Sequence, residues 1–89
     1  METIFKRQVV TRQNILDALQ EFSEQYPDPE TFDDWLRKET YKYAVRYGEK
    51  KYPPKHILST ATGIPTTKFG GGEETNRVFR QLGFEVGDK

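Results

Sequence analysis

Apolar residues recur at helical spacing in the first third of the chain. Ile15, Leu19 and Phe22 follow one another at intervals of four and three residues, which places them on one face of a helix. Thr11 is a suitable N-cap, because its hydroxyl can accept a hydrogen bond from the first turn. A proline at position 27 pushes Tyr26 out of helical geometry. The pattern therefore predicts a helix between Thr11 and Tyr26.

The middle of the chain changes from a helical period to a strand period. In the segment PDPETFDDWLRKET (27–40), Phe32, Trp35 and Leu36 share one face, so we expect a turn followed by a short helix or helical turn. From 41 to 47, tyrosine and valine alternate with Lys, Ala and Arg, as in a half-buried strand. A turn at residues 48–49 and a short return strand at 50–52 complete a predicted hairpin.

The last third of the chain predicts two more helices and a final strand. Pro54 opens a helix that runs to about residue 62, because the first helical position needs no N–H donor, and Gly63 ends it. Phe69 is expected to anchor the following loop to the core. A further helix spans 73–82 and is capped by Gly83. A strand at 84–86 is expected to pair with the hairpin.

These elements predict one α+β domain around a single small core. It comprises N-terminal helices, a β-hairpin, two further helices and a short C-terminal strand, with flexible ends at residues 1–8 and 87–89. A chain of 89 residues has room for one core only. Hydrophobic residues make up 34% of the chain, so the core has few apolar residues. The six Phe, five Tyr and one Trp compensate for this small number, because each ring removes a large area from water.

The composition narrows the cellular setting. The absence of cysteine excludes disulfides, thiolate metal sites and a cysteine nucleophile. No apolar run approaches the roughly 20 residues that a membrane span needs, and the N-terminus lacks the apolar centre of a signal peptide. We therefore expect a cytoplasmic protein that has no membrane partner.

Charge is balanced overall but uneven along the chain. Residues 1–40 carry five Lys or Arg against nine Asp or Glu, whereas residues 41–89 carry nine against five. Basic side chains can neutralise phosphates, and tyrosines can stack on bases. Lysines can equally keep an edge strand soluble, and the two halves can attract each other within the fold or across a dimer. These alternatives stay open.

The candidate nucleic-acid contacts come mainly from the hairpin. Strand alternation puts Lys42 and Arg46 on the face opposite the tyrosines. We expect the next three lysines, Lys50, Lys51 and Lys55, to reach the same side of the hairpin. Two arginines of the last helix can assist. The predicted contacts are Lys42, Arg46, Lys50, Lys51, Lys55, Arg77 and Arg80.

Other patterns indicate chemistry only weakly. Asp28 after a proline, followed later by Glu49 and Lys51, spells a PD…ExK nuclease series, but that chemistry needs two carboxylates on one metal, whereas these residues lie in turns. His56 is the one histidine and cannot build a His-rich metal site. The glycines at 70–72 precede a helix as in phosphate loops, yet no Lys-Ser/Thr follows and two glutamates would repel an anion. We expect no catalytic residue, metal or cofactor.

Three short segments carry a resemblance to a known family: Tyr52-Pro53-Pro54-Lys55, Phe69-Gly70-Gly71 and Leu82-Gly83-Phe84. In this order and spacing, over about residues 10–86, the chain resembles the N-terminal head domain of McrA-type (ScoMcrA-like), modification-dependent HNH restriction endonucleases. The resemblance implies a module, here standing alone, that accompanies DNA-cleaving or DNA-reading domains, while cleavage belongs to a separate HNH domain. The acidic spacer YPDPETFDD departs from the more apolar, glycine-bearing stretch of many relatives.

We therefore expect a non-catalytic module, associated with restriction–modification, that contacts DNA phosphates through the basic hairpin. Its partners would be DNA and a nuclease or another protein. The alternative is a protein–protein interaction or dimerisation module with no affinity for nucleic acid.

Overall fold

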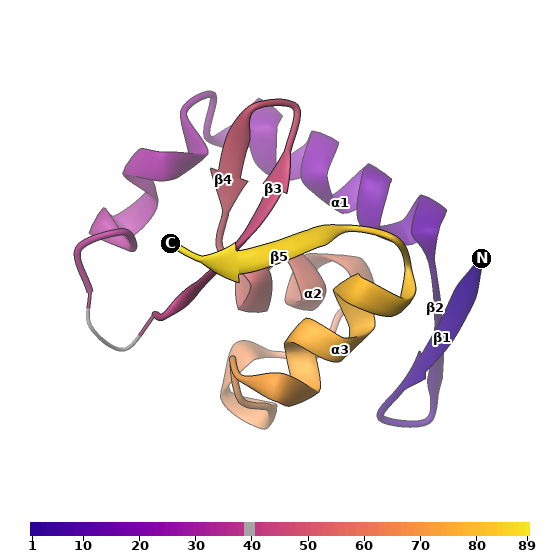
Figure 1. Cartoon of the computed structure of the whole chain (residues 1–89). Helices are drawn as coiled ribbons and strands as arrows, with labels where there is room; N and C mark the ends of the chain where they lie inside the picture. Colours follow the sequence, from indigo (N-terminus) through magenta and orange to yellow (C-terminus); the bar gives the residue numbers. More distant parts are fainter. Residues whose placement is uncertain (39–40) are drawn as a thin grey trace.

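A three-stranded antiparallel sheet lies at the centre of the fold, which the computed structural model describes for residues 1–38 and 41–89 (Figure 1). In spatial order its strands are β4 (Lys50–Tyr52), β3 (Tyr43–Tyr47) and β5 (Glu85–Asp88). Val45 in the middle strand lies opposite Tyr52 on one side and Val86 on the other. The predicted hairpin and its pairing with the C-terminal strand are confirmed.

Three helices contribute to the core on the Val45 face of this sheet: α1 (Arg12–Gln25), α2 (Pro54–Thr62) and α3 (Glu73–Gln81). Helix α1 begins with a capping box, in which the Thr11 hydroxyl accepts from the Asn14 N–H and the Asn14 side chain accepts from the Thr11 N–H. Helix α2 ends at Gly63, whose φ of +77° is left-handed and therefore favours glycine. All three predicted helices are confirmed.

The acidic segment after α1 forms a 3₁₀ helix, η1 (Pro29–Asp34), with a kink inside it. Asp33 has a φ of +48°, which breaks the helical path. Trp35 is fully buried and donates its Nε1–H to the Pro29 carbonyl at 2.7 Å. Phe32 packs against the main core cluster, whereas Trp35 is buried outside that cluster. Residues 39 and 40, the end of the predicted helical segment, lie outside the described residues.

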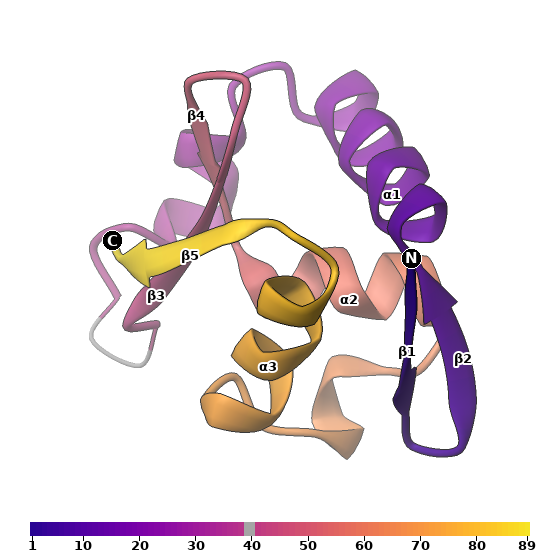
Figure 2. The ribbon, with the colours of Figure 1, turned by 45° about the vertical axis from the view of Figure 1, so that its right-hand side comes forward.

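A second hairpin at the N-terminus was not predicted (Figure 2). Its strands are β1 (Glu2–Phe5) and β2 (Gln8–Thr11). Phe5 and Val10 are buried, and the Phe5 ring meets Phe69 edge-on at a centroid distance of 5.1 Å. Ile4 and Val9 pair on the exposed face. Residues 2–5, expected to belong to a flexible end, therefore form a strand that joins the core, and residues 87–88 belong to β5.

The turn of this N-terminal hairpin explains why the sequence pattern did not reveal it. Lys6 and Arg7 occupy the turn with φ values of +49° and +66°. Two-residue hairpin turns with positive φ are usually signalled by Gly, Asn or Asp. The left-handed backbone costs roughly 1–2 kcal/mol per residue, and the burial of Phe5 and Val10 offsets that cost. The tertiary contact selects this turn, because the local sequence does not favour it.

One main cluster of buried side chains joins all of these elements except η2 (Thr66–Lys68), the short 3₁₀ helix that follows α2. Aromatic edges connect its parts: Phe22 of α1 lies 4.9 Å from Tyr26, 5.1 Å from Phe32 and 6.2 Å from Tyr52, measured between ring centroids. Phe69 is buried, so its predicted role as the anchor of the glycine loop is confirmed. No helix in the described part of the chain is long and apolar enough to cross a membrane.

Replacement of Phe5 tests whether the N-terminal hairpin belongs to the cooperative core. Phe5→Ala removes a ring that is 1% exposed, so we expect the free energy of unfolding to fall by about 3–5 kcal/mol. Chemical denaturation followed by circular dichroism measures this change. Ile4→Ala on the exposed face is the matched control and should change the stability by less than about 0.5 kcal/mol. Equal effects of the two variants would contradict the packing described above.

Candidate nucleic-acid interface

Three segments that are far apart in the sequence line one open cleft. It consists of two hollows of about 170 Å³ and 150 Å³ that share Lys42, Tyr43 and Gly71 in their walls. The full lining comprises Tyr41, Lys42, Tyr43, Pro54, Lys55, Gly71 and Gly72. The start of β3, the first turn of α2 and the glycine loop before α3 therefore meet at this place.

Two helices begin at this cleft. The first turn of α2 closes with the Ile57 N–H donating to the Pro53 carbonyl at 3.1 Å, and neither α2 nor α3 has a side-chain cap at its N-terminus. The glycine loop is held by the Thr75 hydroxyl, which donates to the Gly70 carbonyl at 2.6 Å. Uncapped first turns leave backbone N–H groups without intrahelical partners, and they carry the positive end of the helix dipole.

Lys42 and Lys55 are the two cations in the cleft wall. Neither forms an ion pair with any residue that the structure describes. The aliphatic stem of Lys55 packs beside Gly71, where its Cδ lies 3.6 Å from the position that a Cβ would take. Its ammonium group lies 5.9 Å from the Phe69 ring centroid. The cleft therefore presents two positive charges that the described fold does not neutralise.

Arg46 and Lys51 lie opposite each other on one face of the sheet but are engaged within the fold. The Arg46 guanidinium forms an ion pair with Glu85 at 3.1 Å and donates to the Asp88 carbonyl at 3.3 Å. The Lys51 ammonium donates to a backbone oxygen of Lys89 at 3.1 Å. These two residues thus help to hold the C-terminal strand.

The remaining predicted contacts lie elsewhere. Lys50 is the cross-strand partner of Tyr47, so it faces the other side of the sheet, where it donates to the Pro27 carbonyl at 2.9 Å. On α3, Arg77 donates to the Ile4 carbonyl at 3.2 Å and Arg80 pairs with Glu73 at 3.3 Å. The expectation that Lys50 lies on the same side as Lys51 was therefore wrong, because successive residues of a strand point to opposite faces.

The glutamates at the start of α3 repel an anion less strongly than their sequence positions suggested. Glu73 pairs with Arg80 at 3.3 Å, and Glu74 pairs with Lys6 from the N-terminal hairpin at 3.3 Å. Each pair is exposed to solvent, so it contributes little to stability. The paired cations nevertheless offset the negative charge next to the glycine loop.

A family model for the ScoMcrA-like N-terminal head domain matches residues 8–88, nearly the whole chain. The chain belongs to this family. The resemblance carried by the three short segments is confirmed, and the match extends slightly beyond residues 10–86. The chain is thus a head domain of the restriction-endonuclease-associated kind, a type of domain that is not itself the catalytic part of such proteins. No curated protein and no solved structure matches it.

The sequence did not reveal that the glycine loop of the head domain faces the lysines. The signals for this cleft were present as two separate patterns, the basic hairpin leading into Pro54-Lys55 and the loop at 69–72. The two patterns are separate in the sequence, and neither predicts the cleft by itself. Only the packing of α2 beside the loop before α3 brings Lys55 next to Gly71, and the contact of α2 with β3 adds Tyr41 and Tyr43 to the wall.

The residues of the PD…ExK pattern have structural roles in the head domain. Asp28 is the N-cap of η1, where its Oδ1 accepts from the Glu30 N–H at 3.3 Å. Glu49 occupies the β3–β4 turn with a φ of +67°. Across residues 1–38 and 41–89 we find no group of three His, Asp or Glu side chains that could hold a metal ion.

His56 on α2 is half-buried next to two aromatic rings. Its ring is 4.8 Å from Phe32 and 6.0 Å from Tyr41, and its buried Nδ1 has no hydrogen-bond partner among the described residues. Burial lowers the pKa of His56 below 6.5, the adjacent charge of Lys55 lowers it further, and Asp33 opposes the shift. The neutral imidazole is therefore the form that the fold prefers.

This preference predicts a pH dependence of stability. Because the pKa of His56 is lower in the folded chain than in the unfolded chain, protonation favours unfolding, and stability should decrease as the pH falls below 6.5. The melting temperature of the wild type should drop between pH 7.5 and 5.5, while His56→Gln should remove most of the drop. The pKa of Asp33 is already below 3.8, so this carboxylate does not titrate in that window. Identical profiles for both proteins would contradict the assignment.

Proposed function

We propose that this head domain is a non-catalytic DNA-contacting module that seats backbone phosphates in the cleft between Lys42 and Lys55. The observation that carries the proposal is the pairing of these two uncommitted cations with an open glycine loop. Lysine ammonium groups neutralise phosphates and release their counterions, which supplies most of the free energy of nonspecific binding. Membership of a restriction-endonuclease-associated family supports DNA as the polyanion.

The surroundings of the cleft support the same ligand. The backbone at Gly70 and Gly72 is open, because no atom lies within 4 Å of the position that a Cβ would take. A phosphate oxygen can therefore approach the backbone of the loop closely. The first turns of α2 and α3 add partial positive charge at the same place. Tyr41 and Tyr43 provide rings beside an unstacked base.

The internal ion pairs of the head domain favour an external partner for the basic surplus of residues 41–89. Among residues 1–38 and 41–89 there are four such pairs: Lys6–Glu74, Lys38–Asp33, Arg46–Glu85 and Arg80–Glu73. None of them joins an acidic residue of the first 40 to a basic residue of the last 49. Attraction between the two halves within one described chain therefore does not account for the basic surplus of residues 41–89, which leaves a polyanion as the better explanation.

Single charge reversals inside and outside the cleft test the proposal. We expect weak binding of a fluorescein-labelled 16-bp DNA duplex, with dissociation constants on the order of 10⁻⁴–10⁻⁶ M near physiological salt. Lys42→Glu or Lys55→Glu should each weaken binding and reduce the slope of log K against log salt by about 1, because each removes one phosphate contact. Fluorescence anisotropy over a salt series measures both quantities.

Lys50→Glu is the matched control, because it makes the same charge change outside the cleft, at a lysine that is bonded to the Pro27 carbonyl. It should leave the salt slope unchanged. Circular dichroism at each salt concentration confirms that all three variants are folded. Absence of binding at 20 mM salt by the wild type, or an equal loss of slope in Lys50→Glu, would overturn the proposed interface.

A further inference from the structure

The turn between β1 and β2 consists of two exposed cations, Lys6 and Arg7, whose φ values are +49° and +66°. The burial of Phe5 and Val10 explains why a tight turn forms here, but it does not explain why both turn residues are basic. Gly, Asn or Asp would form the same turn with less backbone strain. Strained backbone that the surrounding fold enforces is frequent at binding sites. The identity of these two side chains therefore needs an explanation other than folding.

Few opposing charges surround the Lys6–Arg7 turn. Residues 3–11 contain no Asp or Glu. The Lys6 ammonium pairs at 3.3 Å with Glu74 in the first turn of α3, and this contact holds the turn against the helix. Arg7 forms no ion pair with any residue that the structure describes. Lys6 therefore positions the turn, whereas the guanidinium of Arg7 is available to a ligand.

Two more cations flank the turn, one from α3 and one from η2. Arg77 is exposed, and its guanidinium donates to the Ile4 carbonyl at 3.2 Å, which places it beside the hairpin. Lys68 is exposed at the end of η2, directly before Phe69, whose ring meets Phe5 edge-on at 5.1 Å. Within residues 1–38 and 41–89, neither Arg77 nor Lys68 forms an ion pair. Three separate parts of the chain thus contribute cations to one region.

This basic region lies next to the Lys42–Lys55 cleft. The Phe69 ring, which contacts Phe5, also lies 5.9 Å from the Lys55 ammonium. The Lys6 ammonium lies 5.7 Å from the Phe5 ring centroid. In both views of the ribbon, the β1–β2 turn and the loop between α2 and α3 lie at the lower edge, whereas the β3–β4 turn lies at the upper edge (Figure 1 and Figure 2). The turn and the cleft are therefore well within the length of one turn of B-DNA, which is about 34 Å.

We propose that the Lys6–Arg7 turn is a second contact with the DNA duplex that the cleft binds, and that Arg7 meets its phosphates. The inference rests on the proposed function, because the cleft supplies the first contact. A guanidinium forms charge-assisted and frequently bidentate hydrogen bonds with a phosphate group. Phosphate contacts at two separate places fix the orientation of a duplex on a protein surface. The head domain thereby holds DNA in one direction, which the cleft alone does not achieve.

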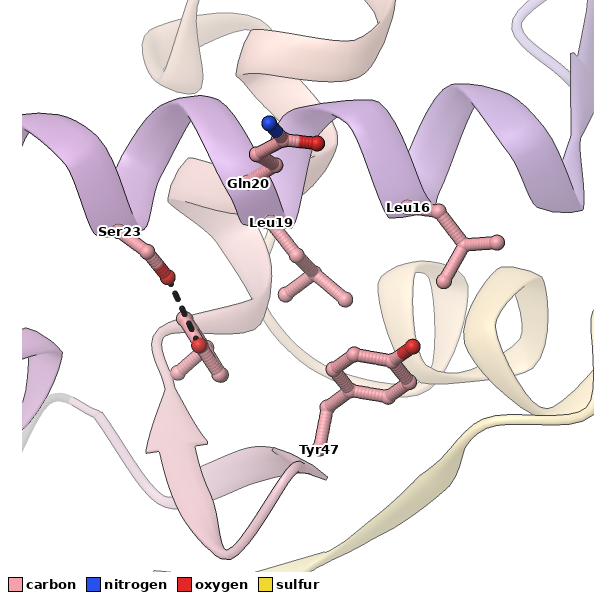
Figure 3. Close-up of a pocket in the computed structure, with 6 residues that line it drawn as sticks. Leu16, Leu19, Gln20, Ser23 and Tyr47 are labelled. Atoms are coloured by element: carbon pink, nitrogen blue, oxygen red, sulfur yellow. Dashed lines mark hydrogen bonds between the residues drawn. The ribbon is translucent and has the colours of Figure 1, made fainter.

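A groove elsewhere on the molecule serves as an internal reference, because none of its lining residues is charged. It lies between α1 and the β3–β4 hairpin and has a volume of about 240 Å³ (Figure 3). Leu16 and Leu19 point from the helix toward the Tyr47 ring. The hydroxyls of Ser23 and Tyr52 are hydrogen-bonded to each other at 2.9 Å. This lining offers no cation to a phosphate, so we expect DNA to leave the groove unperturbed.

Arg7→Gly separates binding from folding, because it removes the cation and relieves the strained turn in one step. The melting temperature should rise by a few degrees. Affinity for the labelled 16-bp duplex should nevertheless fall at least threefold at 20 mM salt, and the slope of log K against log salt should fall by about 1. Arg7→Lys keeps the charge and should retain the slope. Lys50→Gln removes one positive charge at the upper edge of the molecule and should leave affinity and slope unchanged.

The outcomes separate this inference from the proposed function. Unchanged binding by Arg7→Gly, together with weaker binding by Lys42→Glu, would overturn the second contact and leave the cleft proposal standing. Weaker binding by Arg7→Gly alone, with Lys42→Glu and Lys55→Glu unaffected, would overturn the cleft and retain the turn as a DNA contact. Absence of DNA binding by the wild type would overturn both.

A double variant tests whether the two contacts are made with the same duplex. Arg7→Gly combined with Lys42→Glu should reduce the salt slope by about 2, because each change removes one phosphate contact from one complex. A slope equal to that of either single variant would overturn the shared interface. Circular dichroism confirms that each variant is folded.

Chemical-shift mapping with the unlabelled duplex gives an independent readout. Amide signals of residues 5–8 should shift together with those of Lys42, Lys55 and Gly71, while those of residues 16–23 in the groove should not. Shifts confined to the cleft would overturn the second contact.

Discussion

The burial of β3 between two neighbouring strands is the constraint on which the rest of the head domain depends. Ala44 and Val45 point to opposite faces of this strand, and both are fully buried. Hydrogen bonding to β4 on one edge and to β5 on the other brings the C-terminus of the chain against its middle. The strand is therefore fixed on both edges and on both faces, which makes it a rigid support for the residues at its ends.

Two hollows of the surface lie at the ends of this strand. Tyr43 lines the lysine cleft and Tyr47 lines the groove beside α1. Four residue steps at about 3.3 Å separate the two tyrosines by roughly 13 Å. A strand that is fixed on both edges keeps the lysine cleft and this groove at a constant separation.

Contacts within the fold determine which basic residues are available to a ligand. Arg46 and Lys51 hold the C-terminal strand, and Arg80 and Lys6 pair with the glutamates at the start of α3. Exposed ion pairs of this kind add little stability, yet they determine which cations stay available for a ligand. Among the described residues, Lys42 and Lys55 of the cleft are therefore cations without an ion-pair partner.

The amino-acid sequence by itself determined the elements whose signals are local. The helix caps at Thr11 and Gly63 and the alternation around Val45 depend on residues within one turn or one strand, so α1, α2 and β3 could be predicted. The family could also be identified, because its segments at 52–55, 69–71 and 82–84 are contiguous in the sequence. These features need no knowledge of how distant parts of the chain meet.

Only the tertiary structure decided the features that depend on long-range contacts. The N-terminal hairpin exists because Phe5 finds Phe69, although Lys6 and Arg7 are poor turn residues. Lys55 becomes a cleft residue because α2 packs near the glycine loop, and Lys50 is excluded because the register of β3 and β4 points it toward Pro27. Residue spacing along a strand or helix determines which side chains share a face of that element. Packing of the elements determines what each face contacts.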